Sequence, residues 1–179
     1  APELPGALDV VARLVANGVV VSAGHSAATF DQARAGFDAG IRAVTHLFNA
    51  MGPLDHREPG LAGAALTDDR VMIGIVPDGL HVHPAVVSIL RRAGGGDRVG
   101  IVTDASAALG SAPGVHRLAS REVDCDETSA RLPNGVLAGS MLALDQAVRN
   151  LALFAGCSHD EALRAVTVVP ARLLGVDLA

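Results

Sequence analysis

Four short apolar runs constrain the fold of this chain more than any other feature. They lie at residues 19–23, 41–45, 71–76 and 99–103, and each is followed by a helical pattern or a loop. The first run is rich in β-branched residues and apolar on both faces, which is typical of a strand in a buried parallel sheet. Strands that alternate with helices predict an α/β fold in which the strands run in the same direction.

Helix signals flank these runs. Apolar residues recur at helical spacing over 8–15, and Thr29 with Gln32 forms a capping-box pattern ahead of a second helix. Pro84 suits the first turn of a third helix, because the nitrogen of proline needs no hydrogen-bond acceptor there. Further helices are predicted after Ser140, after the capping-box pattern of Ser158 and Glu161, and from Pro170.

Residues 105–139 interrupt this alternation. They are rich in Gly, Ser, Ala and Pro, and we interpret them as a long loop that carries a β-hairpin with its turn at Asn134-Gly135. No linker or repeat divides the 179 residues, so we expect one domain. Four parallel strands are too few for a (β/α)8 barrel, which takes roughly 250 residues. The sheet is therefore either open or half of a larger barrel.

Composition argues against several classes of protein. The net charge is -5, aromatic residues are 2% of the chain, and no Lys/Arg-rich run occurs, so a nucleic-acid surface is not expected. The apolar runs are too short to span a membrane. Cys125 and Cys157 stand in no metal-ligand pattern, so we expect both to be buried free thiols in a cytoplasmic protein.

Four polar residues follow the four predicted strands: His25, His46, His81 and Asp104. The carboxyl ends of parallel strands meet at one edge of a sheet, where sites assemble. Imidazole nitrogens bind zinc or iron, and a carboxylate beside a metal site suits a general base. A single such residue would more simply be a structural histidine or a helix cap, but four at equivalent positions predict a functional cluster.

The loop after His46, residues 47–63, is a second candidate. It is rich in small residues whose backbone N–H groups could cradle an anion, and Arg57 offers a planar fork that suits phosphate. An ordinary loop with a solvated arginine remains the alternative from these residues alone.

Several motifs then occur in order along nearly the whole chain. They are Ser22-Ala23-Gly24-His25-Ser26, Thr45-His46-Leu47-Phe48-Asn49-Ala50-Met51, Arg57-Glu58-Pro59-Gly60, Asp78-Gly79-Leu80-His81, Val102-Thr103-Asp104-Ala105 and Leu137-Ala138-Gly139-Ser140. In these motifs the chain resembles the family of N-acetylglucosamine-6-phosphate deacetylases, which belong to the metal-dependent amidohydrolases.

The resemblance implies a role for each strand-end residue. His25 and His46 match two ligands of a divalent metal, with zinc the first expectation and iron the alternative. Asp104 matches the catalytic acid/base, and His81 matches a histidine that contacts the substrate and polarises its acetamide carbonyl. The implied reaction is attack of a metal-activated water on N-acetyl-D-glucosamine 6-phosphate, giving acetate and D-glucosamine 6-phosphate.

The resemblance also implies substrate contacts and an oligomer. Arg57 matches an arginine that reaches the sugar phosphate in the neighbouring subunit, so a homodimer is expected. The other expected substrate contacts are Asn49, Ala50, Asp78, Gly79, Leu80, His81, Leu137, Ala138 and Gly139.

The resemblance covers only part of the family's fold. It implies that residues 1–179 are the C-terminal half of a (β/α)8 barrel, without the first barrel strands, the small β-sandwich and a glutamate metal ligand. Glu3 falls in a different segment and does not replace that ligand. We therefore expect the isolated chain to be inactive and poorly folded, because an open edge strand exposes backbone groups and apolar surface.

Three alternatives remain open at this point. The enzyme could act on the galactosamine epimer of the substrate, the chain could be a non-catalytic module that binds sugar phosphates, or it could be a gene fragment without a function. The acid/base position of Asp104 argues against pure binding, which needs no such residue.

Overall fold

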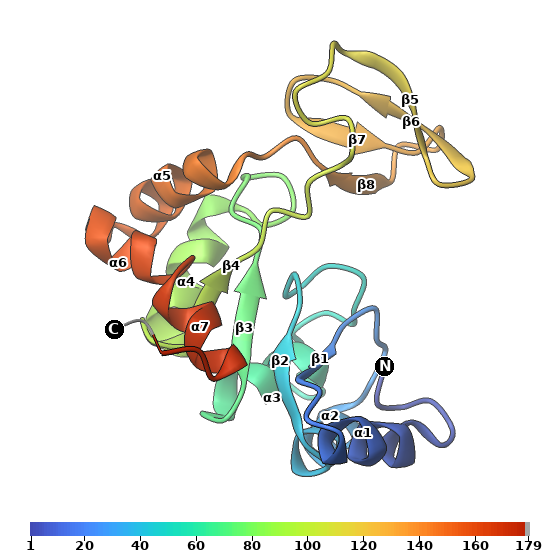
Figure 1. The fold of residues 1–179 in the computed structure, drawn as a ribbon, viewed down its shortest axis with the longest axis vertical. Coiled ribbons are helices and arrows are strands. Elements are labelled where there is room, and N and C mark those ends of the chain that lie inside the picture. The colour runs from blue at the N-terminus through green and yellow to red at the C-terminus, as the bar shows by residue number, and fades with distance from the viewer. Residues whose placement is uncertain (178–179) are drawn as a thin grey trace.

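The computed structural model describes residues 1–177 and contains two four-stranded sheets (Figure 1). The first sheet is parallel, with its strands in chain order β1-β2-β3-β4. The strands are β1 (Val21–Ala23), β2 (Ile41–Val44), β3 (Met72–Ile75) and β4 (Val99–Ile101). The prediction of an α/β fold with four parallel strands is therefore confirmed, although each strand is shorter than its apolar run.

Seven helices accompany the sheets in the part of the chain that the structure describes. They are α1 (Ala7–Ala16), α2 (Phe30–Asp38), α3 (Gly60–Thr67), α4 (Pro84–Gly94), α5 (Leu144–Ala155), α6 (His159–Arg164) and α7 (Val168–Leu174). The capping box of α2 forms as predicted: Gln32 N donates to Thr29 Oγ1, and Thr29 N donates to Gln32 Oε1. Pro84 opens α4, and Gly175 ends α7 in a left-handed conformation.

Helix α3 is a correction, because we interpreted residues 47–63 as a loop. Its first six residues, 60–65, are all buried, so the helix is apolar on every side and shows no amphipathic period. Its small residues allow close packing: a Cβ on Gly63 would lie 2.3 Å from Pro59 Cβ. The sequence of α3 therefore lacks the one-sided apolar pattern that predicts a helix, and the structure shows that this is because the segment is buried on all sides.

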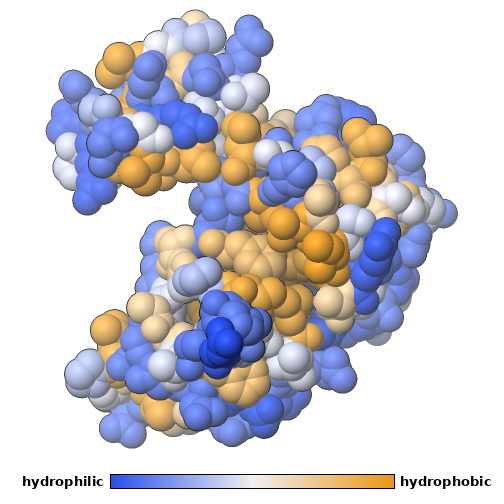
Figure 2. All heavy atoms as spheres, turned by 180° about the vertical axis from the view of Figure 1, so that it is seen from behind, coloured by the Kyte–Doolittle hydropathy of each residue, from blue (hydrophilic) through white to orange (hydrophobic). Residues whose placement is uncertain are grey.

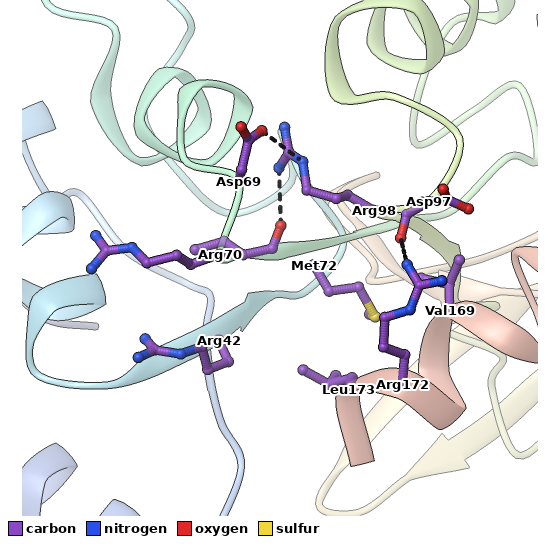
Figure 3. A pocket seen from close by; sticks show the side chains of 10 residues that line it. Arg42, Asp69, Arg70, Met72, Asp97, Arg98, Val169, Arg172 and Leu173 are labelled. Atoms are coloured by element: carbon purple, nitrogen blue, oxygen red, sulfur yellow. Dashed lines mark hydrogen bonds and ion pairs between the residues drawn. The ribbon is translucent and has the colours of Figure 1, made fainter. Parts of the chain in front are cut away.

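The amino ends of the strands form a polar pocket of about 250 Å³, away from the predicted site (Figure 3). Its arginines serve the fold. Arg42 Nη1 donates to the carbonyl oxygens of Phe37 and Ile41, and Arg98 Nη1 donates to those of Ala65, Asp68 and Val71. Among these acceptors, the carbonyls of Phe37 and Ala65 belong to the last turns of α2 and α3 and have no partner within the helix, and the others lie at the start of β2 or in the segment that leads to β3.

The second sheet is antiparallel and follows the order β5-β6-β7-β8. Its strands are β5 (Gly114–Leu118), β6 (Arg121–Cys125), β7 (Ser129–Arg131) and β8 (Leu137–Ser140). The predicted turn at Asn134-Gly135 joins β7 to β8, where Leu132 N donates to Val136 O. The single hairpin was an underestimate, because β5 and β6 form a second antiparallel pair, in which Val123 and Cys125 are buried and give only a weak apolar signal.

The second sheet stands apart from the first and has a small core of its own. Seen from behind, the molecule is hollowed between the part built on the second sheet and the part built on α1 and α2 (Figure 2). Apolar residues gather along this hollow. Cys125 is buried in the small core as predicted, whereas Cys157 is only half-buried, and both thiols are free.

Within residues 1–177, no helix combines the length and the apolar character needed to cross a bilayer.

Candidate active site

The four strand-end residues line one cavity of about 510 Å³. His25 follows β1, His46 follows β2, His81 lies in the loop after β3, and Asp104 follows β4. The predicted convergence is therefore confirmed, because adjacent parallel strands bring their carboxyl ends to the same edge.

His25 and His46 are in direct side-chain contact in this cavity. Their Nε2 atoms lie 3.0 Å apart, and the two rings meet edge to face with centroids separated by 4.8 Å. The Nδ1 atom of His46 is buried and has no hydrogen-bond partner among residues 1–177. The pair therefore places two imidazole nitrogens side by side at the carboxyl ends of β1 and β2.

This arrangement fits a metal ion with nitrogen ligands. Two imidazole nitrogens bound to one tetrahedral zinc, at about 2.0–2.1 Å each, stand roughly 3.3 Å apart. The observed 3.0 Å is close to that separation and also matches a direct N–H···N hydrogen bond between the rings. Within the described part of the chain, no set of three His, Cys, Asp or Glu side chains is grouped to hold an ion.

The backbone is unusual at three of the four positions. His25, His46 and Asp104 have φ values of 46°, 29° and 49°, in the left-handed region that residues with a side chain seldom adopt. Each such residue costs about 1–3 kcal/mol and persists only where its surroundings hold it. Residues strained in this way gather at functional sites, which strengthens the case for this cavity.

Glu3 holds the loop after His25. Its carboxylate accepts a hydrogen bond from Ser26 Oγ at 2.7 Å and one from Ala27 N at 2.8 Å. Burial alone would raise the pKa of Glu3, but these hydrogen bonds outweigh it and keep the pKa below its ordinary value. Glu3 was not expected to take part in the site, and it contacts Ser26, the residue next to the predicted ligand His25.

Asp78 backs His81. Nδ1 of His81 donates to Asp78 Oδ2 at 2.5 Å, and Nε2 of His81 lies 3.8 Å from Asp104 Oδ2. Burial opposes ionisation of Asp78, but hydrogen bonds from the side chain and amide of His81 and from Leu80 N outweigh it, so its pKa is lowered. Asp78, expected as a substrate contact, does not line the cavity and instead orients a residue that does.

The loop after His46 contributes part of its predicted residues. Asn49 and Ala50 line the cavity, and Asn49 Nδ2 donates to the carbonyl oxygens of His46 and Leu47 at 3.3 Å each. Arg57 does not line the cavity; it is exposed and contacts the neighbouring His56. Glu58, beside Arg57, accepts from Phe30 N at 2.7 Å and so anchors the loop to the start of α2.

The second sheet supplies the opposite wall of the cavity. Leu137, Ala138 and Gly139 line it as predicted, whereas the predicted contacts Gly79 and Leu80 do not. Four further lining residues were not predicted. They are Ala105, Ser106, Leu118 and Val136. Leu118 and Val136 carry no sequence signal for a site, because sheet pairing rather than any local motif brings them to the cavity.

Comparison with known proteins finds relatives over nearly the whole chain. An N-acetylgalactosamine-6-phosphate deacetylase from Escherichia coli O157:H7 is 44% identical over 99% of this chain and 47% of its own length. An N-acetylglucosamine-6-phosphate deacetylase from Homo sapiens is 40% identical over 99% of this chain and 44% of its own length. No family model matches the chain.

Solved structures agree with these relatives. An N-acetyl-D-glucosamine-6-phosphate deacetylase from Mycobacterium smegmatis, solved with N-acetyl-D-glucosamine-6-phosphate, superposes with a TM-score of 0.94 at 42% identity. A relative from Thermotoga maritima gives a TM-score of 0.92 at 34% identity. The two alignments cover 98% and 97% of this chain and 48% of each relative. The resemblance seen in the motifs is confirmed, and the chain spans about half the length of the relatives it matches.

Proposed function

This chain is a homologue of the N-acetylglucosamine-6-phosphate deacetylases along nearly its whole length, and we propose that it carries the catalytic cluster of such an enzyme. The reaction is hydrolysis of the acetamide of N-acetyl-D-glucosamine 6-phosphate to D-glucosamine 6-phosphate and acetate. The observation that carries the proposal is one cavity that contains His25, His46, His81 and Asp104.

His25 and His46 would hold a divalent metal, because their Nε2 atoms already lie 3.0 Å apart. Imidazole ligands favour zinc, with iron as the alternative. When bound, such an ion supplies a Lewis acid and makes water a stronger nucleophile at neutral pH. A third protein ligand would come from outside residues 1–179.

Asp104 is the acid/base of the proposed reaction. Its carboxylate is partly open to the cavity, with 46% of the side chain exposed, so it can reach both a water and a substrate. It accepts the proton of the attacking water and returns a proton to the nitrogen of the departing amine. Because the nitrogen receives that proton, the sugar leaves as a neutral amine and not as a deprotonated amine anion.

His81 stabilises the charge that develops on the acetamide oxygen. Because Asp78 accepts from Nδ1, the proton on that nitrogen is fixed, and Nε2 is the atom that faces the cavity. Nε2 would donate a hydrogen bond to the carbonyl oxygen when both ring nitrogens carry a proton, and that bond would strengthen as the tetrahedral intermediate forms, with the Asp78 carboxylate balancing the charge of the ring.

The remaining substrate contacts are assigned by position. Asn49, Ala50 and the 137–139 wall would bind the sugar, and Arg57 would bind the phosphate in the site of a second subunit of a homodimer. Exposure of Arg57 outside its own cavity supports that role, because its guanidinium lies at the surface, in contact with His56, and not in the site of its own chain.

The complete natural protein would close this sheet into a (β/α)8 barrel. In-order parallel strands with a site at their carboxyl ends support this, as does the length of the relatives, about twice that of this chain. Residues 1–179 would then be one part of a catalytic domain, inactive when isolated. Two free thiols and a sugar-phosphate substrate fit a cytoplasmic location.

The proposal is tested with the complete natural protein and Asp104→Asn. We expect the wild type to release acetate from N-acetylglucosamine 6-phosphate with zinc bound, and the variant to lose turnover at least about 100-fold. Substrate binding by the variant, measured by calorimetry, should change little. A folded, metal-loaded wild type that binds the sugar phosphate without turnover would instead support the non-catalytic binding module.

A second candidate substrate has a specific observation in its favour. A relative that is 44% identical is an N-acetylgalactosamine-6-phosphate deacetylase. We propose the galactosamine epimer as the alternative, and kcat/KM measured side by side for both epimers decides between them. The better substrate is the one with the higher kcat/KM.

A further inference from the structure

The end of β8 is hydrogen-bonded to both sides of Asp104. Ser140 N donates to Asp104 O at 2.7 Å, and Ser106 N donates to Ser140 O at 2.8 Å. These bonds form a parallel bridge between Ala105 and Ser140. A strand of the second sheet therefore continues onto the loop that carries the proposed acid/base.

The hydroxyl of Ser140 adds two contacts in a fully buried position. Its Oγ donates to Thr103 O at 2.5 Å and accepts from Leu142 N at 3.0 Å, and the residue is 0% exposed. The carbonyl of Thr103 belongs to the peptide group that leads into Asp104. The orientation of this peptide is coupled to the φ of Asp104, which is 49°. The hydroxyl thus holds in place the peptide that sets a strained backbone angle.

Gly139 lets the strand come this close. Its φ is 114°, and a Cβ built on it would lie 3.0 Å from Asp104 O. Only a residue without a side chain adopts this conformation easily and leaves room for that carbonyl. Two consecutive residues therefore determine the approach of β8 to Asp104: Gly139 leaves room for it, and Ser140 makes the hydrogen bonds.

We propose that Ser140 is a positioning residue for Asp104. By fixing the peptide between Thr103 and Asp104, its hydroxyl holds the carboxylate toward the cavity, 3.8 Å from His81 Nε2. Ser140 does not line the cavity, so it acts through Asp104. The inference rests on the proposed function, in which Asp104 is the acid/base.

Ser129 provides a matched control. It lies on β7 directly opposite Ser140 in the strand ladder and is 2% exposed. Its hydroxyl contacts the carboxylate of Asp126 at 3.4 Å rather than the Asp104 loop. Ser129→Ala and Ser140→Ala therefore each remove one buried hydroxyl from the same sheet, and only the second removes a contact to Thr103.

The kinetic test uses the complete natural protein with its metal. We expect Ser140→Ala to lower kcat about 10- to 100-fold, as for small misplacements of catalytic groups, and to leave KM within about twofold. The low-pH limb of its kcat–pH profile should be shifted along the pH axis relative to that of the wild type. Ser129→Ala should keep the wild-type profile, and Ser140→Thr, which restores the hydroxyl, should recover most of the loss. Equal kcat losses in the two alanine variants, or a wild-type kcat in Ser140→Ala, would overturn the proposal.

A second measurement needs no turnover, so it separates this proposal from the proposed function. Amide hydrogen exchange of Ser106 and Ser140 reports how firmly β8 holds the Asp104 loop. We expect exchange at least about tenfold faster in Ser140→Ala and unchanged in Ser129→Ala. Unchanged exchange in Ser140→Ala contradicts the positioning role even if the wild type proves inactive. If Ser140→Ala does not fold, Ser140→Cys replaces it, since its thiol is of similar size but a weak donor.

Discussion

Asp78 Oδ2 lies 2.5 Å from His81 Nδ1, and the two side chains are only 5% and 4% exposed. The other carboxylate oxygen accepts from Leu80 N at 2.8 Å and from His81 N at 2.7 Å. Asp78 is thus held by its own turn and in turn fixes the imidazole. A buried carboxylate in this relation orients a histidine and determines which nitrogen carries the proton.

Loss of this carboxylate should impair the reaction more than binding. We expect Asp78→Ala to lower kcat about 10- to 100-fold, the usual range for the loss of a residue that orients an active-site histidine, with a small change in KM. Steady-state kinetics on the complete protein check this. Asp160→Ala, at an exposed aspartate in α6, is the control and should behave as wild type. A KM effect without a kcat effect would return Asp78 to the role of a substrate contact.

The Asp68–Arg70 pair should make stability depend on pH. Hydrogen bonds from the Arg70 side chain, at 2.9 and 2.6 Å, lower the pKa of Asp68 to about 2 from 3.8. Because the folded pKa is depressed, the stabilisation is fully present above pH 3.8 and is lost as pH falls toward 2. Allowing for the half-exposed Arg70, the contribution is about 1–2 kcal/mol.

Urea unfolding of wild type and Asp68→Asn measures this contribution. The difference in the free energy of unfolding should be about 1–2 kcal/mol at neutral pH and should narrow as the pH falls from about 4 toward 2. A difference that stays constant over this range would show that the charge of Asp68 is not its source.

Removal of either histidine of the pair should weaken metal binding. Loss of a residue that only supports a metal ligand lowers metal affinity about 10- to 100-fold. We expect His25→Ala and His46→Ala each to lower the affinity further, because each removes a direct ligand. Metal content after dialysis of the complete protein is the measurement. Asp104→Asn serves as the comparison and should keep a higher metal content than either histidine variant. Full metal content in both histidine variants would exclude the pair as ligands.

Arg57 should act in trans if the homodimer forms. Alone, Arg57→Ala and Asp104→Asn should each have low activity at low substrate concentration. Mixing the two after subunit exchange should restore roughly a quarter of wild-type activity, because half of the dimers then contain one site with both residues. Arg121→Ala, a change in β6, is the control. Its mixture with Asp104→Asn should have the same activity as a mixture of the wild type with Asp104→Asn. No recovery on mixing would place Arg57 in its own subunit's site or outside the reaction.

Gly139→Ala should affect both stability and turnover. The new methyl group would meet Asp104 O at 3.0 Å on a backbone with φ of 114°, so we expect about 1–3 kcal/mol of destabilisation and a lower kcat. Gly135→Ala separates the two causes: its φ is 82°, but nothing lies within 4 Å of the new methyl group. It should lower the unfolding free energy while leaving kcat unchanged. Equal kcat values in Gly139→Ala and Gly135→Ala would show that the contact between residue 139 and Asp104 does not affect turnover.

The sheet and its polar edge were predictable because their signals are local. A β-branched apolar run followed by a polar residue marks the end of a buried strand, and His25, His46 and Asp104 each occupy such a position. Parallel strands in chain order then bring these ends together whatever the details of the packing. The capping boxes at Thr29 and Ser158 were predictable for the same reason, since their hydrogen bonds span only three residues.

Helix α3 and the second sheet depend on partners elsewhere in the chain. Residues 60–65 form a helix that is buried on every side, so they lack the one-sided pattern by which a sequence reveals a helix. Leu118 and Val136 reach the cavity through the pairing of β5 to β8.

The sequence by itself therefore determined the parallel α/β class, the positions of the strand ends and the identity of the residues that meet there. Only the tertiary structure decided which distant residues hold them: Glu3 against the loop after His25, and Ser140 against the loop of Asp104. It also showed that Arg57, expected to act in a neighbouring subunit, does not line the cavity of its own chain. The physical reason is range, since strand and cap signals act between near neighbours, whereas these orienting hydrogen bonds mostly join residues far apart in the chain and form only once the whole fold has packed.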